Sequence, residues 1–490
     1  MPSPSPLETY FGGAFVVRLL LQRGVAAIYC LAYLNVLNQF KPLLGERGLL
    51  PVSAHLERVR FRDAPSVFHF RYSDRLLDAV AWTGLALSLF ALTGLSERGP
   101  WWLSLAVWLA LYVLYLSIVN VGQTFYGFGW ESMLLEAGFF AAFLGPAGLR
   151  PSLVPVLALR WMLFRVELGA GLIKLRHDRC WRDLTCLYFH YETQPLPNPL
   201  SRTFHHFPRP FQRASVAFSH FVQLVVPFGL FAPQPVASVA GALLCVHQLL
   251  LVVSGNYAWL NWLTIVLGFS AFGDGTLAAV LPCVHSAGAS AASRPFALEL
   301  LLDVLAGATL LLSVKPALNL VSKRQAMNAT YNSLHLVGSY GAFGSVTRER
   351  YEIVVEGSAD TALTDATAFR EYEFKGKPGD PRRRPRPWAP YHLRLDWLMW
   401  FLPLRLRNKR PGFVPLGYEL WFMRLIEKLL EGDRRLLSLL HENPFPDEPP
   451  RFVRASLYRY EFTTRDERAS SGLVWKRTRV GDYLGPVSRH

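Results

Sequence analysis

The sequence has 490 residues, which is long enough for two or three domains. It is 51% hydrophobic and only 18% charged, and its mean hydropathy of +0.20 argues against an ordinary soluble protein. The formal net charge of +15 resides in loops beside apolar runs, without a fold or repeat that reads bases. We therefore expect lipid headgroups, and no nucleic acid, as the anionic neighbours of these loops.

Apolar segments of membrane-spanning length recur through the first two thirds of the chain. The clearest, WWLSLAVWLALYVLYLSIV at residues 101–119, has no ionisable residue and begins with tryptophans typical of a membrane interface. The first segment lacks a small-residue cleavage site before a polar start, so we expect an uncleaved anchor. The sequence predicts about nine spans. The other eight lie at residues 15–37, 76–94, 130–149, 152–173, 214–232, 235–253, 257–281 and 296–315.

The sequence divides into three regions. Residues 1–14 are a short tail, and residues 15–322 hold the spans together with two long polar loops, at 38–75 and 174–213. From residue 323 to residue 490 the apolar runs shorten, as in a folded soluble domain. The expected fold is thus a polytopic α-helical membrane region followed by a mixed α/β, strand-containing domain.

Local patterns in the third region predict its elements. Residues 350–357, 371–375 and 457–463 alternate between apolar and polar side chains, as half-buried strands do. The apolar spacing in residues 416–430 is typical of an amphipathic helix.

The expected span at 152–173 carries charges along one helical face. Arg160, Glu167 and Lys174 fall at helical spacing and alternate in sign. Ionisable groups at membrane depth normally face a protein interior and find partners. The charged face therefore has two possible interpretations, a structural network between helices or the wall of a polar cavity. We expect Glu167 to neutralise Arg160 or Arg165. The predicted network comprises Arg160, Arg165, Glu167, Glu299 and Asp303.

The loop that follows carries two of the five cysteines in a polar setting. Cys180 and Cys186 lie near His177 and His190, an arrangement compatible with a disulfide, with free thiols, or with zinc. We assign no metal to it. A disulfide would indicate that the loop faces an oxidising compartment.

Long, unusual strings show a resemblance to a known family. They are NVGQTFYGFGWESMLLEAGF (residues 120–139), HYETQPLPNP (190–199), SGNYAWLNWLT (254–264), YNSLHLVGSYGAFGSVTRER (331–350), EFKGKPGDPRRRP (373–385), PYHLRLDWLMWF (390–401) and NPFPDEPPRFVR (443–454). In these strings the chain resembles the lipase maturation factor family. The resemblance implies a multi-pass protein of the endoplasmic reticulum membrane, or of the inner membrane if bacterial. It also implies a chaperone-like role in bringing homodimeric secreted lipases, such as lipoprotein lipase, to an active state.

The resemblance also implies an extracytoplasmic C-terminal domain. With nine spans and a cytoplasmic N-terminus, both long basic loops would then lie outside, against the positive-inside tendency. We give the resemblance more weight, because long domains translocate largely regardless of charge. A glycosylation sequon at Asn328 agrees with that side.

Two classes of function remain. In the first, a non-enzymatic folding factor without cofactor or catalytic residues contacts lipases through its loop, unless these side chains pack on its own domain. The candidates are Trp181, Tyr188, Tyr191, Pro195, Pro197 and Pro199. In the second, an intramembrane enzyme acts on a lipid or quinone through buried polar residues, although no hydrolase or oxidoreductase motif accompanies them. The available groups are Glu131, Glu136, Arg160, Arg165, Glu167, His220, His247, Asp274, Glu299 and Asp303. We favour the folding factor.

Overall fold

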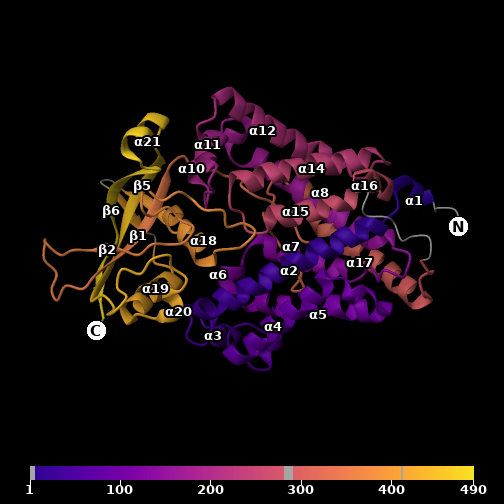
Figure 1. The fold of residues 1–490 in the computed structure, drawn as a ribbon, viewed down its shortest axis with the longest axis horizontal. Coiled ribbons are helices and arrows are strands. Elements are labelled where there is room, and N and C mark those ends of the chain that lie inside the picture. The colour runs from indigo at the N-terminus through magenta and orange to yellow at the C-terminus, as the bar shows by residue number, and fades with distance from the viewer. Residues whose placement is uncertain (1–5, 281–290, 410–411, 416, 490) are drawn as a thin grey trace.

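The computed structural model describes residues 6–280, 291–409, 412–415 and 417–489. Figure 1 shows a bundle of long helices at one end of the molecule and a strand-containing domain at the other, with the N-terminus and the domain at opposite ends. One continuous apolar core extends through both parts.

The first half of the bundle is built around one long central helix. The main helices are α2 (Phe15–Leu44), α4 (Asp74–Leu92), α5 (Trp101–Val121), α7 (Gly129–Ala141) and α8 (Leu153–Arg176). Helix α2 packs against α4 and α7, and buried Tyr33 donates a hydrogen bond of 2.9 Å to the Leu111 carbonyl of α5. A Cβ atom at Gly84 of α4 would lie 2.1 Å from the Tyr33 ring, so this close approach requires glycine.

The second half of the bundle contains shorter and interrupted helices. They are α12 (Arg209–Leu224), α13 (Val226–Gly229), α14 (Val236–Ser254), α15 (Leu260–Gly268), α16 (Asp274–Val280) and α17 (Phe296–Val321). Short helices in the tail and loops are α1 (Pro6–Phe11), α3 (Val52–Leu56), α6 (Gln123–Tyr126), α9 (Arg179–Arg182), α10 (Leu187–Thr193) and α11 (Ser201–His205).

Five of the described helices are long and apolar enough to cross a membrane: α2, α4, α5, α14 and α17. A sixth candidate is the pair Leu260–Ala271 and Asp274–Val280, which is bent by 114°. The expectation of about nine spans is thus met for five or six segments. Helix α7 has 13 residues, the segment at 214–232 is divided between α12 and α13, and α8 carries several charges. Leu281, the last residue of the expected span at 257–281, lies outside the described residues.

The C-terminal domain contains a four-stranded antiparallel sheet. Its strands β1 (Arg350–Ser358), β2 (Arg370–Glu371), β5 (Phe452–Phe462) and β6 (Trp475–Ser488) lie in the order β2-β1-β5-β6. Opposite residues Ile353 and Leu457 fix the central register. A separate hairpin joins β3 (Leu406–Lys409) and β4 (Gly412–Pro415). The helices of the domain are α18 (Arg394–Phe401), α19 (Leu420–Glu431), α20 (Arg434–Leu437) and α21 (Arg465–Ser471).

Helix α19 is the amphipathic helix expected at residues 416–430, of which residue 416 lies outside the described part. Its apolar face is buried in the core shared with β5, and it ends at Gly432, whose φ of +67° suits a left-handed cap. The buried side chains are Trp421, Phe422, Leu425, Ile426, Leu429 and Leu430.

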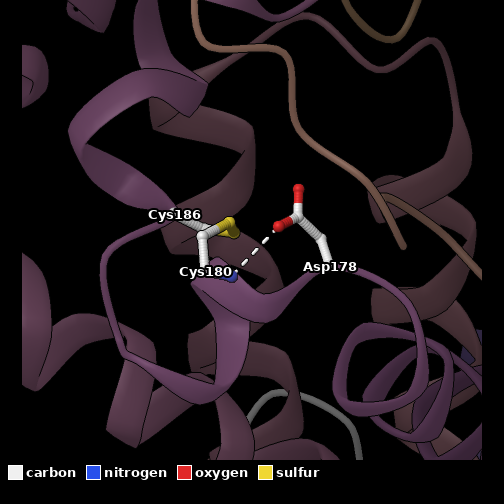
Figure 2. Close-up of side chains that lie close together, drawn as sticks. All are labelled: Asp178, Cys180 and Cys186. Atoms are coloured by element: carbon white, nitrogen blue, oxygen red, sulfur yellow. Dashed lines mark hydrogen bonds between the residues drawn. A yellow bond between two sulfur atoms is a disulfide. The ribbon is translucent and has the colours of Figure 1, made fainter.

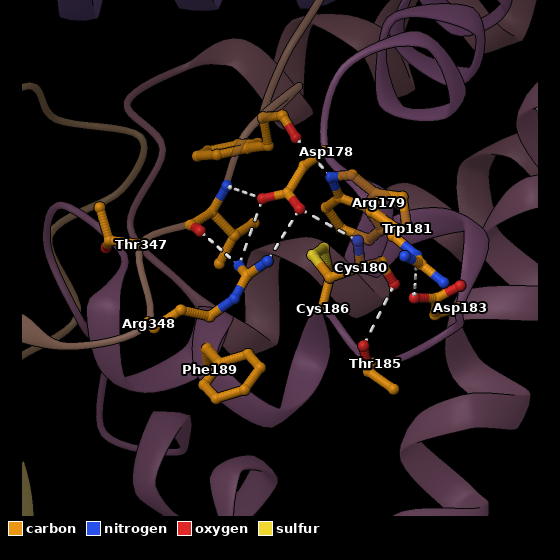
Figure 3. Close-up of a disulfide and its surroundings, with 12 residues drawn as sticks. Asp178, Arg179, Cys180, Trp181, Asp183, Thr185, Cys186, Phe189, Thr347 and Arg348 are labelled. Atoms are coloured by element: carbon orange, nitrogen blue, oxygen red, sulfur yellow. Dashed lines mark hydrogen bonds and ion pairs between the residues drawn. A yellow bond between two sulfur atoms is a disulfide. The ribbon is translucent and has the colours of Figure 1, made fainter.

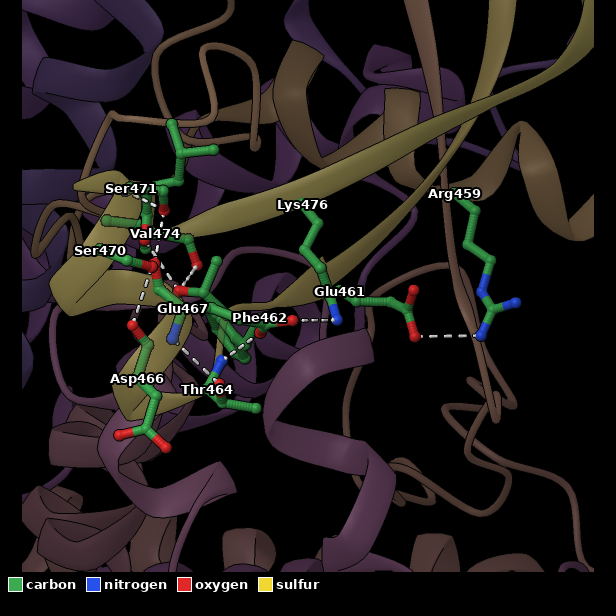
Figure 4. Close-up of polar contacts among 12 residues, drawn as sticks. Arg459, Glu461, Phe462, Thr464, Asp466, Glu467, Ser470, Ser471, Val474 and Lys476 are labelled. Atoms are coloured by element: carbon green, nitrogen blue, oxygen red, sulfur yellow. Dashed lines mark hydrogen bonds and ion pairs between the residues drawn. The ribbon is translucent and has the colours of Figure 1, made fainter.

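A capping box forms the turn between β5 and β6. Thr464 Oγ1 accepts a hydrogen bond of 3.2 Å from the Glu467 amide, and the Glu467 carboxylate accepts one of 2.7 Å from the Thr464 amide (Figure 4). Lys476 at the start of β6 pairs with the same carboxylate at 2.9 Å. These contacts hold α21 as a rigid link between the two longest strands.

Polar contacts mark the two ends of the helical bundle. At the domain end, the Asn35 and Gln39 side chains donate to the His392 carbonyl at 2.6 Å each. At the opposite end, the Asp274 carboxylate accepts from the Phe15 amide at 2.7 Å and from the Val16 amide at 2.9 Å. The bundle is therefore joined to the domain at one end and closed on itself at the other.

Candidate functional site

The loop at residues 174–213 contains a disulfide between Cys180 and Cys186, with the Cα atoms 4.8 Å apart (Figure 2). Asp178 begins helix α9 by accepting a hydrogen bond of 3.0 Å from the Cys180 amide. Ligand atoms of these three residues lie within 4.8 Å of one another. Zinc binds thiolates, however, and here the two sulfurs are bonded to each other.

Asp178 also binds the segment that enters the C-terminal domain. Its carboxylate forms an ion pair of 2.8 Å with Arg348 and accepts a hydrogen bond of 3.2 Å from the Val346 amide (Figure 3). Burial opposes ionisation, but these donors outweigh it and hold the pKa of Asp178 below its usual value. The disulfide loop is thus fastened by a charged group to the chain that leads into β1.

The side chains expected to offer exposed contact area are mostly buried. The Trp181 ring is 3% exposed, and its Nε1 donates a hydrogen bond of 2.9 Å to the Phe343 carbonyl. Tyr191 is buried as well, and so are Pro195 and Pro197. The expectation that Trp181, Tyr191, Pro195 and Pro197 are exposed is wrong, because the loop packs beneath the domain. The other two candidate contact residues are half-buried. Those two are Tyr188 and Pro199.

The same loop is hydrogen-bonded to the sheet. Arg350 of β1 donates to the carbonyls of Glu192 at 2.9 Å and Pro195 at 3.1 Å, and the Phe462 amide of β5 donates to the Glu192 carboxylate at 2.7 Å. Arg202 donates to the Thr463 carbonyl at 2.9 Å. Burial raises the pKa of Glu192 to about 7. Loop and domain therefore form one body on one side of the helical bundle.

The buried charges of α8 pair differently from the prediction. Arg165 forms its ion pair with Glu136 of α7, which also accepts from the Tyr340 hydroxyl at 2.7 Å and from the Gly338 amide at 3.0 Å. The expected pairing of Arg165 with Glu167 is therefore wrong. Helical spacing identifies the polar face of α8 but does not indicate which helix packs against it.

The other members of the predicted network are spread over several places. Arg160 donates to the carbonyls of Leu230 and Ser270, and Glu167 accepts from two glutamines rather than from an arginine. Glu299 pairs with Arg294 at 2.8 Å, and Asp303 is exposed. Arg160 lies beside interrupted helices, where unpaired backbone carbonyls satisfy its guanidinium.

A buried ion pair outside the predicted network joins the domain to the bundle. Arg394, at the start of α18, pairs at 2.8 Å with Glu131 of α7, and both side chains are fully buried. Arg394 also donates to the Phe125 carbonyl at 2.8 Å and to Asn35 Oδ1 at 2.7 Å. Glu131 was one of the polar residues available to the hypothetical intramembrane enzyme, but its ion-pair partner Arg394 lies 263 residues later in the chain. The only sequence signal was an arginine within the apolar string LRLDWLMWF.

A cavity of about 790 Å³ lies between the bundle and the domain. Its wall is aromatic: the Phe128 and Trp130 rings stack at 4.6 Å, and Trp397 meets Trp130 edge-to-face at 5.0 Å. Phe401 and Leu404 stand at its edge and are exposed. Such a rigid aromatic wall supplies contact area at low entropic cost.

The sequon residue Asn328 is exposed and lines this cavity. Its Oδ1 accepts a hydrogen bond of 3.3 Å from the Gly341 amide.

The chain is similar to known proteins over nearly its whole length. Residues 16–279 match the lipase maturation factor transmembrane domain, and residues 336–485 match the lipase maturation factor C-terminal domain. Lipase maturation factor 1 of Bos taurus is 41% identical over 99% of this chain and 91% of the relative, and that of Homo sapiens is 40% identical over 99% and 90%. Lipase maturation factor 2 of Rattus norvegicus is 28% identical over 97% and 83%. No solved structure matches the chain.

These matches cover both the helical bundle and the sheet domain, and they give no support to the intramembrane enzyme. The chain belongs to the lipase maturation factor family.

Proposed function

We propose that this protein is a membrane-embedded maturation factor that assists secreted lipases in reaching their active form. The observation that carries the proposal is the 41% identity to a lipase maturation factor 1 over 99% of the chain. By the same resemblance, its clients are homodimeric lipases of the lipoprotein lipase kind. It acts in a chaperone-like manner in the endoplasmic reticulum membrane, or in the inner membrane of a bacterium, with membrane lipids around the bundle.

The proposed topology has nine passes and an extracytoplasmic C-terminal domain. Helix α1 and the C-terminal domain lie at opposite ends of the bundle (Figure 1), which supports an odd number of passes. The disulfide at Cys180 and Cys186 supports an oxidising environment for the loop. Because Arg350 and Glu192 join this loop to the sheet, the domain shares its side.

The proposed client surface is the aromatic cavity together with the neighbouring loop. Phe401 and Leu404 offer exposed apolar area beside the 790 Å³ space, and Tyr188 and Pro199 offer half-buried area on the loop. Trp181 serves as a support, because its ring is buried and holds the loop to Phe343. An unfolded or unassembled client exposes apolar side chains that such a surface can cover.

A charge at the edge of the cavity tests this surface. Leu404 is 46% exposed, so Leu404→Asp leaves the core intact. Leu363 is 45% exposed but lies outside the cavity, which makes Leu363→Asp the matched control. Each variant is expressed in cells lacking the endogenous factor, and the activity of a secreted lipase is measured per unit of lipase protein.

We expect Leu404→Asp to lower this activity about threefold or more, because a charge desolvated on contact weakens binding, while Leu363→Asp rescues fully. Equal rescue by both variants would remove the cavity from the client surface. Failure of the unmodified chain to rescue any dimeric lipase would overturn the proposed function itself.

A further inference from the structure

A network of buried polar side chains joins four helices inside the bundle. Glu167 of α8 accepts hydrogen bonds from Gln223 of α12 at 3.1 Å and from Gln248 of α14 at 2.7 Å. Their amide oxygens in turn accept from Lys174 Nζ at 2.6 Å and from Asn261 Nδ2 of α15 at 2.8 Å. All five side chains are at most 5% exposed. Glu167 therefore orients two amides, and these hold a lysine and an asparagine in place.

The network borders a partly open cavity of about 160 Å³. It adjoins the aromatic cavity, and the two share the wall formed by Leu260, Asn328, Gly341, Ala342 and Phe343. Among the described residues, Asn261 Oδ1 and His247 Nδ1 are buried without a hydrogen-bond partner, and both side chains line this cavity. Lys174 Nζ donates a hydrogen bond to Gln223 and lies 5.0 Å from the centroid of the Trp181 ring. It forms no ion pair within the described part of the chain. Buried polar atoms left unpaired are costly, so they indicate a missing ligand.

The size and the opening of the cavity restrict this ligand. A protein cavity of about 150 Å³ holds a molecule of the size of benzene, so this one takes a three-carbon head but not a sterol ring system. Phe211 of α12 and Leu250 of α14 line the space and are about half exposed. Because Leu250 lies near the end of α14, a candidate span, we infer that the opening adjoins the lipid at that end of the span. The ligand is therefore a lipid whose head lies inside and whose chain leaves through the opening.

The charges of the wall decide the head group. Lys174 and Glu167 line the same cavity and balance each other, so an added anion would leave a net buried charge. Lys174 provides N–H donors, and Asn261 Oδ1 provides a free acceptor. An ester carbonyl can accept a hydrogen bond from Lys174, and a hydroxyl can donate one to Asn261 Oδ1. We propose that this cavity binds an uncharged, hydroxylated single-chain lipid of the monoacylglycerol class.

The test uses the purified full-length protein in phosphatidylcholine nanodiscs and tritiated monooleoylglycerol as the probe. Two lipids with the same acyl chain serve as competitors. Oleate has an anionic head, and methyl oleate has an uncharged ester without a hydroxyl. We expect saturable binding of about one molecule per protein, displaced by unlabelled monooleoylglycerol at concentrations about tenfold lower than either competitor requires. Stronger displacement by oleate would overturn the uncharged head, and equal displacement by methyl oleate would overturn recognition of the hydroxyls.

Two pairs of proteins locate the binding. Ser215→Trp fills the opening from α12 without touching the network, whereas Ala217→Trp places the same ring at an exposed position of α12 outside the cavity. We expect Ser215→Trp to weaken binding about tenfold and Ala217→Trp to leave it unchanged. Lys174→Met, compared with unmodified protein, should weaken it similarly. Equal binding by both tryptophan variants would assign the probe to the lipid-facing surface and end the proposal. The assay contains no lipase, so its result is independent of the maturation role.

Discussion

Arg394 of the C-terminal domain is inserted into the helical bundle, where its guanidinium meets the Glu131 carboxylate at 2.8 Å with both side chains fully buried. The Tyr115 hydroxyl donates to the other oxygen of that carboxylate at 2.5 Å, and Arg394 also lies over the Tyr126 ring at 3.4 Å. A buried pair with this many partners defines one docked arrangement. The domain is therefore part of the bundle's core and does not behave as a unit on a flexible tether.

Removing this arginine should be strongly destabilising. Arg394→Met leaves the Glu131 carboxylate buried without its cation, a change that typically costs about 3–5 kcal/mol. The exposed pair between Arg424 and Glu427, at 3.6 Å, provides the control, because such pairs contribute roughly 0–1 kcal/mol. The measurement is the melting temperature in detergent, followed by size-exclusion chromatography. A similar, small loss for Arg394→Met and Arg424→Met would show that the domain is not held through this pair.

The two buried arginines of α8 should respond differently to substitution. Arg165→Met would strand the Glu136 carboxylate, whereas Arg160→Met would free only the carbonyls of Leu230 and Ser270. A stranded charge costs more than a stranded carbonyl, so we expect Arg165→Met to lower the melting temperature further. Adding Glu136→Gln to Arg165→Met should recover part of the loss. No recovery in the double variant would contradict the pairing.

The folded state should lose stability as Glu192, which lies between the loop and the sheet, ionises at rising pH. Burial raises the pKa of the Glu192 carboxyl from its ordinary 4.5 to about 7. An acid that binds its proton more tightly when folded contributes stability that is complete below pH 4.5 and is lost as the pH rises through about 7. His205, 3.6 Å away, has its pKa lowered by burial to about 4, so it stays neutral over most of this range.

We therefore expect the melting temperature of the unmodified protein to fall relative to that of Glu192→Gln between about pH 5 and about pH 8. Glu192→Gln keeps an acceptor for the Phe462 amide but cannot ionise, so it lacks this contribution to the pH profile. The same slope in the variant and in the unmodified protein would assign the pH dependence to other groups.

The sheet could be predicted where alternation reflects local burial. The strand expected at residues 350–357 is confirmed as β1, Arg350–Ser358, and the one at 457–463 lies largely within β5. In the segment 371–375, Glu371 pairs with β1 and the Tyr372 amide donates to the Val355 carbonyl at 2.9 Å, but Glu373 already bridges Glu442 instead. Period-two alternation reports a buried face but not how long a neighbouring strand continues beside it.

The partners of the buried charges could not be predicted in the same way. Spacing along α8 identified Arg160, Glu167 and Lys174 as one polar face, but their partners come from α12, α14 and the turn that follows α15. Likewise, Trp181 looked like an exposed contact residue, since aromatic residues favour both cores and interfaces. Which of the two applies depends on the segment around Phe343, 162 residues later.

The last prediction concerns the side of the membrane on which the domain lies. Ala362 is exposed in the connection between β1 and β2 and lies outside the helices and strands, so Ala362→Cys should leave the fold unchanged. Ser358, in contrast, is buried in β1, and a cysteine there would not react unless the sheet opened. In sealed vesicles of known orientation, a membrane-impermeant maleimide should label Ala362→Cys only from the lumenal or periplasmic face. The unmodified protein gives the background, which includes the half-buried free thiol of Cys245 and Cys283, outside the described residues; Cys30 is buried, and Cys180 and Cys186 are bonded to each other. Labelling from the cytoplasmic face would place both the sheet and the loop bound to it away from secreted lipases, and direct contact with such clients would then be impossible.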